Sequence, residues 1–241
     1  MSERLNLEEG PILDPIFIEH YWRRGRWPGR LAAWWLGAKM AKLGVPPTAR
    51  VLDIGCGPGW VVRFLARRFP AMSFVGLDLS TPMVRRARAG PDNGSPFSRV
   101  RFVAGDGCRL PFGVATFDVV LSGATLHHID NPVALFNEID RVLAADGHMI
   151  VTDLNRAVPR VLWPLVLLAD WIEKRLRPPA ARAVAEGIAP SFRAAFDTGE
   201  IRRFLDESTL GRRVRHYPRV FGHWIQTPAR LTNRKTSGNR S

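Results

Sequence analysis

Cysteine is nearly absent from this chain of 241 residues, which contains only Cys56 and Cys108. The two do not form a paired spacing, so we exclude a disulfide framework and expect a protein of the reducing cytoplasm. Long hydrophobic runs are also missing. The longest, VLWPLVLLA over residues 161–169, contains Pro164 and is too short to span a bilayer. The first residues, MSERLNLEEG, show no signal-peptide pattern.

Acidic residues are scarce as well, with 22 Asp and Glu against 35 Lys and Arg, a net charge of +13. Residues 1–153 contribute +3 (18 − 15) and residues 154–241 contribute +10 (17 − 7). A basic C-terminal part is compatible with nucleic acid or a membrane surface, and the apolar segment 162–176 with its following arginines suits the membrane surface. No RNA-binding signature of the RNP or KH type accompanies the charge. We therefore interpret most of it as a solvated surface.

Between Arg50 and Asp153, short apolar strands alternate with helical patterns, which predicts a parallel sheet wrapped by helices. Helices are expected over residues 15–45 and in an insertion over residues 157–196. The expected strands are ARVLDIG, MSFVGLDLS, SRVRFVAGD, FDVVLS, GHMIVTDL and two closing segments near Val214 and residues 220–225. The expected helices of the core are WVVRFLARRFP, STPMVRRARAG, NPVALFNEIDRVLAADG and FDTGEIRRFLDES.

The stretch VLDIGCGPGW places Gly55, Gly57 and Gly59 between a strand and a helix. Glycines there allow a tight turn and let a ligand lie against bare backbone at the helix start. The spacing is neither that of a phosphate loop nor that of a dinucleotide site. Asp78 ends the second strand, where a carboxylate can accept both ribose hydroxyls, and Asp106 ends the third strand, placed to accept from an adenine amine. The pattern predicts a nucleoside ligand without a pyrophosphate.

Five motifs in this order resemble the class I S-adenosylmethionine-dependent methyltransferases: VLDIGCGPG, GLDLS, GDG, FDVVLSGATLHHI and RVLAADGHMIVTD. The resemblance covers about residues 48–153 and is nearest to the small-molecule branch, which includes quinone C-methyltransferases and sugar O-methyltransferases of natural-product pathways. It implies an α/β, Rossmann-like, doubly wound fold with a mostly parallel seven-stranded sheet and helical caps before the first strand and after the fifth. The implied divisions are an N-terminal cap over 1–47, a methyltransferase domain over 48–228 with a substrate-cap insertion at about 155–196, and a disordered basic tail over 229–241.

The resemblance also implies how the cofactor S-adenosylmethionine is bound. The implied contacts are Gly55, Gly57 and Gly59 around the methionine moiety, Asp53 at the loop or the amino group, Asp78 at the ribose, Asp106 with Gly107 at the adenine, Leu79 and Cys108 on the adenine faces, Ser122 beneath the sulfonium, and Tyr21 as a cover.

Two adjacent histidines, His127 and His128, follow the fourth strand, and Asp153 ends the fifth. In some sugar O-methyltransferases of the resembled family, a histidine and an acid at these places form an acid–base pair, but relatives that methylate carbon also carry the two histidines. We name His127, His128 and Asp153 as catalytic candidates, with His127 preferred as the base. A role in ordering the loop stays open. The other histidines have no convergent spacing, so no metal site is predicted.

Tryptophans are concentrated in both flanks of the core, which predicts an aromatic wall around a flat or lipophilic acceptor. They are Trp22, Trp27, Trp34 and Trp35 in front, and Trp163 and Trp171 behind. We expect methyl transfer to oxygen, with nitrogen or carbon as alternatives. Two other functions remain open, an RNA methyltransferase that uses the basic C-terminal region and a non-catalytic cofactor-binding protein. The Asn/Asp-Pro-Pro-aromatic motif of amine methyltransferases is missing from the fourth strand.

Overall fold

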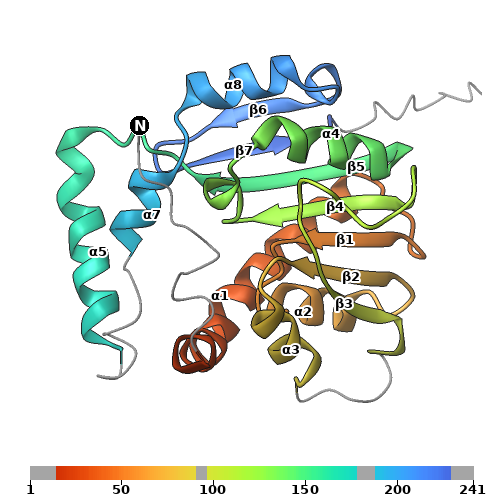
Figure 1. Cartoon of the computed structure of the whole chain (residues 1–241), viewed down its shortest axis with the longest axis horizontal. Coiled ribbons are helices and arrows are strands. Elements are labelled where there is room, and N and C mark those ends of the chain that lie inside the picture. The colour runs from red at the N-terminus through yellow and green to blue at the C-terminus, as the bar shows by residue number, and fades with distance from the viewer. Residues whose placement is uncertain (1–14, 91–96, 178–187, 229–241) are drawn as a thin grey trace, which may run out of the picture.

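The computed structural model describes residues 15–90, 97–177 and 188–228. They form one seven-stranded sheet with helices on both faces (Figure 1). The strands are β1 Arg50–Ile54, β2 Ser73–Asp78, β3 Val100–Ala104, β4 Phe117–Gly123, β5 Leu143–Leu154, β6 Arg215–Pro218 and β7 Gly222–Gln226. The helices are α1 Pro15–Lys42, α2 Trp60–Arg68, α3 Thr81–Arg88, α4 Pro132–Val142, α5 Trp163–Arg175, α7 Ile188–Ala194 and α8 Thr198–Glu207. The expected basic tail, and the first part of the expected N-terminal cap, lie outside the described residues.

The strand order is β3-β2-β1-β4-β5-β7-β6, and all pairings are parallel except those of β7 with β5 and with β6. The expected Rossmann-like, doubly wound fold is confirmed. The chain order reverses between β1 and β4, and open α/β sheets bind ligands at the carboxyl edge beside such a reversal. The two predicted closing strands are observed as β6 and β7, and they form the antiparallel edge of the sheet.

Alternation along the strands divides the core between the two faces of the sheet. Leu52 and Val120 pack with the apolar side of α4 and α8, whereas Val51 and Leu121 pack with α1, α2 and α3. Side chains of a strand point to opposite faces in turn, so a strand buried on both sides is apolar at every position. This is why β4, which has a parallel neighbour on each side, contains the continuous apolar run Val119–Leu121.

The helix predicted over residues 131–147 was extended too far at its C-terminal end. It ends at Val142 instead of extending to Gly147, and β5 begins at Leu143. Leu143 pairs with Phe117 of β4 and is buried in the core. The apolar spacing of Val142 and Leu143 fits a helix as well as a strand, and the pairing with β4 decides in favour of the strand.

Candidate functional site

Three acidic residues stand at the carboxyl ends of three neighbouring strands. Asp53 is the fourth of five residues in β1, Asp78 is the last residue of β2, and Asp106 follows the end of β3 by two positions. The strands are in parallel register, with Asp53 beside Gly76 and Asp78 beside Ala104. The carboxylates therefore lie along one edge of the sheet, next to the reversal at β1 and β4.

The glycine-rich loop after β1 turns tightly against the end of β2. The backbone N–H groups of Gly55 and Cys56 donate to the Leu77 carbonyl oxygen at 2.8 and 3.0 Å. Gly55 has a φ of 72° and Gly57 a φ of 51°, in the left-handed region that favours glycine. A Cβ on Gly55 would overlap the side chain of Thr125, which follows β4. This loop thus requires glycine for its backbone angles and for the close approach of the β4 segment.

The Asp78 carboxylate joins the glycine loop to the start of α3. Its Oδ2 accepts from the Gly57 N–H at 2.7 Å, and its Oδ1 accepts from the Ser80 N–H at 2.9 Å. Burial raises the pKa of Asp78, while these two hydrogen bonds act in the opposite direction. Each carboxylate oxygen keeps a further lone pair, so Asp78 can accept from ligand hydroxyls without giving up the loop.

Asp53 is a buried carboxyl, 6% exposed, beside this loop. Burial first, and the charge of Asp78 second, raise the pKa of Asp53 to about 7. Among the described residues no cationic side chain contributes to this shift. A ligand ammonium placed here would supply the missing positive charge and favour the ionised carboxylate.

Two of the residues expected around an adenine, Leu79 and Asp106, remain accessible. Leu79 is 50% exposed, and Asp106 is exposed with its Oδ1 accepting from the Cys108 N–H at 2.8 Å. Gly107 is buried, and the Cys108 thiol donates to the Asn131 carbonyl oxygen at 3.5 Å. Burial, followed by the charge of Asp106, raises the pKa of the Cys108 thiol to about 11, so this cysteine stays a neutral packing group.

Ser122 of β4 is buried between β1 and β5, beside Ile54 and Val151. Its Oγ has no hydrogen-bond partner among the described residues. Two positions later, Ala124 has a φ of 52°, a strained angle for a residue with a side chain. A buried hydroxyl without a partner is costly, so the end of β4 suits a polar ligand group.

His127 and Asp153 meet at the carboxyl ends of β4 and β5. The His127 Nδ1 lies 2.6 Å from the Asp153 Oδ1, and the His127 backbone N–H donates to Oδ2 at 2.9 Å. Both side chains are nearly inaccessible, with 4% of the His127 side chain and 3% of the Asp153 side chain exposed. The predicted closeness of a histidine and this acid is observed; the catalytic role of the pair stays a prediction.

His128 has a different environment from its neighbour. Its ring centroid lies 4.0 Å from that of His127, and its buried Nδ1 has no hydrogen-bond partner among the described residues. Burial, followed by the proximity of His127, lowers the pKa of His128 to about 4. His128 is therefore neutral near pH 7, and it is not held by the carboxylate.

Two histidines without convergent sequence spacing do come together. The His216 Nε2 lies 3.0 Å from the His223 Nδ1 across β6 and β7, and the His223 Nε2 donates to the Phe196 carbonyl oxygen at 2.9 Å. Sequence spacing did not indicate this pair, because antiparallel pairing of β6 with β7 brings the two residues together. No group of three or more metal-binding side chains occurs in the part of the chain that the structure describes.

The N-terminal helix α1 reaches the glycine loop at Tyr21. The Tyr21 ring lies 3.7 Å from the place that a Cβ on Gly57 would occupy. Tyr21 is 49% exposed over its whole surface, yet its hydroxyl is enclosed enough that burial, with the charge of Asp78, raises its pKa. The expected cover residue is thus placed against the loop, and its contact with a cofactor stays a prediction.

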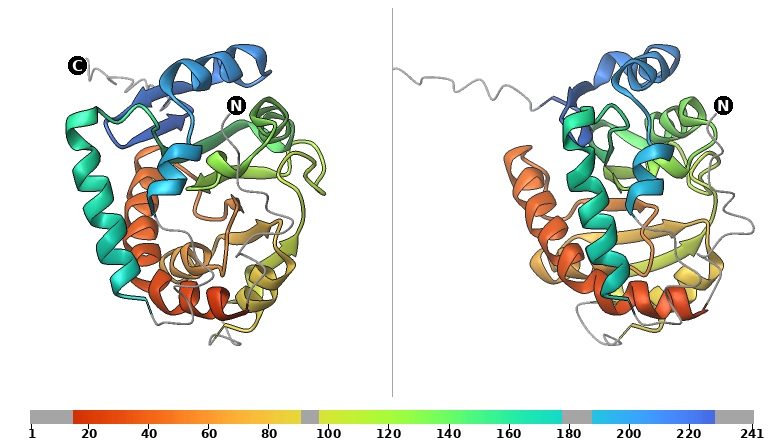
Figure 2. Two further views of the ribbon diagram at one scale, coloured as in Figure 1. Left: turned by 60° about the vertical axis from the view of Figure 1, so that its left-hand side comes forward. Right: turned by 90° about the vertical axis from the view of Figure 1, so that its left-hand side faces the viewer.

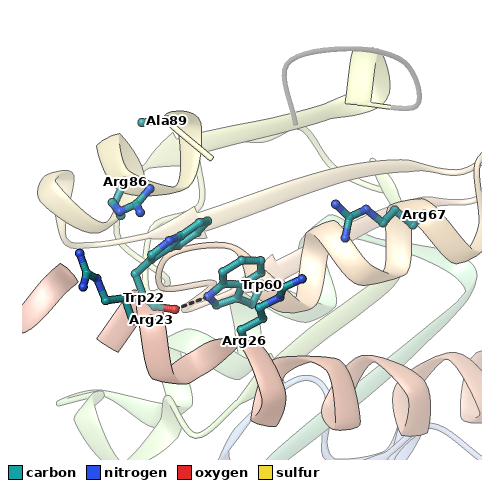
Figure 3. Close-up of a pocket in the computed structure, with 7 residues that line it drawn as sticks. All are labelled: Trp22, Arg23, Arg26, Trp60, Arg67, Arg86 and Ala89. Carbon is teal, nitrogen blue, oxygen red and sulfur yellow. Dashed lines mark hydrogen bonds between the residues drawn. The ribbon is translucent and has the colours of Figure 1, made fainter. Parts of the chain in front are cut away.

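A stack of two tryptophans holds α1 in this position. Trp22 lies on Trp60, the first residue of α2, with ring centroids 4.0 Å apart, and the Trp60 Nε1 donates to the Trp22 carbonyl oxygen at 2.8 Å. Sequence reasoning missed Trp60, because nothing in the GPGW stretch shows which partner it meets. A cavity of about 640 Å³ opens beside the stack (Figure 3), and none of the predicted cofactor residues is among those that line it. Its lining consists of Trp22, Trp60, Arg23, Arg26, Arg67, Arg86 and Ala89.

The flanking tryptophans do not form one aromatic wall, and that expectation was wrong. Trp22 packs on Trp60, and Trp35 packs edge-on against Trp224 at 5.1 Å. Trp27, Trp34 and Trp171 are 69%, 63% and 57% exposed. Whether a tryptophan is buried or exposed depends on whether the side of the helix that carries it packs against another element.

Comparison with known proteins agrees with the geometry. The family model described as "Methyltransferase domain" matches residues 52–151, which run from β1 through most of β5. Residues 52–151 therefore carry a methyltransferase domain of the class I S-adenosylmethionine-dependent type. The matched residues include Asp53, Asp78, Asp106 and both adjacent histidines.

Relatives of this methyltransferase include the demethylmenaquinone methyltransferase of Roseiflexus castenholzii, 35% identical over 62% of this chain and 60% of that protein. The 2-phytyl-1,4-naphtoquinone methyltransferase of Thermosynechococcus vestitus is 28% identical over 85% of each. The solved plantazolicin methyltransferase BpumL is similar with a TM-score of 0.66 and 16% identity, over 90% of this chain and 92% of that one. The chain spans about three fifths of the length of the Roseiflexus protein.

Proposed function

We propose that this methyltransferase transfers a methyl group from S-adenosylmethionine to a hydroxyl of a small aromatic or lipophilic acceptor. The observation that carries the proposal is the row of groups along one sheet edge. It runs from the acids of β3, β2 and β1 to the histidine and aspartate of β4 and β5. The first three suit a nucleoside that carries an amino acid, and the last two suit an acceptor that must lose a proton.

The residues present fit the cofactor. Asp53 has the environment for an ammonium group, because its burial leaves the carboxylate without a cation among the described residues. Asp78 has lone pairs left for ribose hydroxyls, and Asp106 with Gly107 is placed for an adenine. Ser122 offers an unused hydroxyl at the end of β4. When bound, the cofactor supplies an electrophilic methyl group on sulfur.

The chain's own contribution is to position the acceptor and to take its proton. Asp153 receives the Nδ1–H of His127, which leaves Nε2 as the basic nitrogen of the ring. Methyl transfer from the bound cofactor to a hydroxyl would release the hydroxyl proton, and His127 Nε2 would accept it. Because this displacement is in line, holding the oxygen near the methyl carbon supplies much of the rate enhancement.

The chemical class of the acceptor is supported by the relatives. Two similar proteins are named as methyltransferases of demethylmenaquinone and of a phytyl naphthoquinone. No helix among the described residues is long and apolar enough to cross a membrane. A cytoplasmic location stays a prediction, as do the divisions at residues 47 and 228.

The test is incubation of the pure protein with S-adenosylmethionine labelled in its methyl group and with an extract of the source cells. We expect label in the organic-soluble fraction, and none with the Asp78→Ala variant. Label in RNA would overturn the proposal in favour of the basic C-terminal region. Binding of S-adenosylhomocysteine without label in any fraction would indicate a non-catalytic binding protein.

A further inference from the structure

The α5 helix presents an apolar face to solvent. Leu165, Leu168 and Ile172 follow one another at helical spacing and are 55%, 52% and 43% exposed. Trp171 and Leu176 extend the face, at 57% and 61% exposure. On the opposite side of α5 only Val166 and Asp170 are buried. The described part of the chain therefore leaves a contiguous apolar stripe on this helix unpartnered, and large exposed apolar patches mark interaction sites.

The charges around this stripe all have one sign. The exposed ionisable residues from Arg160 to Leu176 are Arg160, Lys174 and Arg175. The two acids of α5 are less exposed: Asp170 accepts from the Ala189 N–H at 3.0 Å and pairs with Lys174 at 2.9 Å, and Glu173 pairs with Arg177. Arg160 and Arg175 therefore supply most of the positive charge beside the stripe, with a smaller share from Lys174. We call the stripe and these three basic residues the α5 face.

Trp171 and Arg175 are arranged as at a membrane interface. The Arg175 guanidinium lies 5.3 Å from the Trp171 ring centroid. Tryptophan is favoured at the level of lipid headgroups, and an arginine beside it keeps its charge in water while its stem covers the ring. A helix of this composition binds anionic lipid through apolar burial together with electrostatic attraction.

The α5 face lies on the same side of the molecule as the candidate active site. The η3 turn, Leu126–His128, contacts α7, and α5 packs on α7 (Figure 2). The charges of Glu173 and Arg177, at the end of α5, act on His20 of α1. A surface that covers α5 would therefore border the carboxyl edge of the sheet.

We propose that the α5 face docks on the surface of a bilayer that contains anionic lipid, from which the acceptor enters the site. Entry of the acceptor from the bilayer rests on the proposed function, since it requires a lipophilic acceptor. A second copy of the chain is a poorer occupant. Two α5 faces would bring Arg160, Lys174 and Arg175 of both copies together, with no exposed acid on either face to pair with them.

The test is cosedimentation of the full chain with phosphatidylcholine vesicles, with and without phosphatidylglycerol, in the absence of cofactor and acceptor. We expect binding to the anionic vesicles that weakens as salt is added. Leu168→Glu should weaken it by about tenfold or more, because a charge then enters the centre of the apolar stripe. Val114→Glu is the matched control, since Val114 is 73% exposed in the loop before β4, at the other edge of the sheet.

S-adenosylhomocysteine binding, measured for each variant, shows that the fold is intact. The inference is overturned if the unchanged chain does not bind the anionic vesicles, or if Leu168→Glu binds them equally well. It is also overturned if the unchanged chain is a dimer and Leu168→Glu abolishes that dimer. Loss of vesicle binding in Val114→Glu as well would also overturn it, because the site would not be α5. Methyl transfer plays no part in this readout, so a failure of the proposed reaction leaves vesicle binding intact and distinguishable.

Discussion

His127 Nδ1 lies 2.6 Å from Asp153 Oδ1, and the other oxygen of the same carboxylate accepts from the His127 backbone N–H. One carboxylate thus fixes the ring orientation and the backbone of the residue that carries it. Leu154 donates its backbone N–H to Oδ1 as well, at 2.6 Å. An imidazole held in this way has a defined tautomer. A general base requires a defined tautomer, whereas a histidine that only packs in a loop does not.

His127→Ala should lower turnover by about a hundredfold or more, because the acceptor hydroxyl then has no base. The affinity for S-adenosylhomocysteine should stay unchanged, as shown by calorimetry. Asp153→Asn should also lower turnover and alter its pH profile, since the amide cannot stabilise a charged imidazole. His148→Ala is the control: His148 is a buried histidine of β5 bound to Thr227. Unchanged turnover in His127→Ala would leave the pair with a structural role only.

Asp78→Ala should weaken S-adenosylhomocysteine binding by about a hundredfold or more, because the variant loses the predicted ribose acceptor together with the hydrogen bond that holds Gly57. Titration calorimetry measures the change. Asp118→Ala provides the comparison, since Asp118 accepts from the Arg50 N–H at 2.8 Å, at the opposite edge of the sheet. Equal affinities in the two variants would refute a ligand-binding role for Asp78.

Asp53 should make the cofactor-free protein less stable as pH rises from about 4 to about 7. The folded pKa lies above the unfolded value of 3.8, so the stabilising contribution is complete below pH 3.8, falls as the unfolded carboxyl ionises, and is fully lost once the pH passes the folded pKa. Asp53→Asn should raise the melting temperature most at pH 8, less at pH 5, and least near pH 3.8. The ionised form costs on the order of a few kcal/mol. Thermal melts across this pH range measure the effect, with Asp118→Asn as the control variant. A difference in melting temperature between Asp53→Asn and the unchanged chain that does not vary with pH would contradict a raised pKa of Asp53.

The same carboxyl gives cofactor binding an opposite pH dependence. Since a ligand ammonium pairs with the ionised form, affinity for S-adenosylhomocysteine should fall by up to about tenfold per pH unit below pH 7. Asp53→Asn should bind weakly at every pH. Calorimetry in buffers of different ionisation enthalpy should detect release of a proton on binding at pH 6, and its absence would show that Asp53 does not meet the amino group.

Gly55→Ala should destabilise the fold more than Gly44→Ala does. Both glycines have nearly the same left-handed backbone, with φ of 72° and 71°. A Cβ meets nothing within 4 Å at Gly44 but overlaps Thr125 at Gly55. The backbone cost of alanine, about 1–2 kcal/mol, is common to both variants. Denaturant unfolding should therefore show an extra loss at Gly55, and equal losses would mean that the β4 loop moves aside without cost.

The helices and strands of the core were largely predictable because each depends on neighbours in sequence. The start of α3 is an example: either Ser80 or Thr81, followed by Pro82, predicts a helix start, and the structure shows Ser80 as the N-cap, with its Oγ accepting from the Met83 N–H at 3.3 Å. The end of α4 was not predictable, since pairing with β4 decides it. Thr125 carried no signal either: its importance comes from its contact with Gly55, 70 residues away (125 − 55).

The sequence by itself determined the order of the elements, the glycine loop and the identity of the acids at the strand ends, because periodicity, caps and turn residues are local properties. Only the tertiary structure decided which groups meet. Strand pairing and helix packing bring His127 and not His128 into contact with Asp153. They also bring Trp22 onto Trp60 and His216 beside His223. The same packing left Trp171 in solvent. Burial depends on segments far apart in the chain, so no local pattern could tell an aromatic core residue from an exposed one.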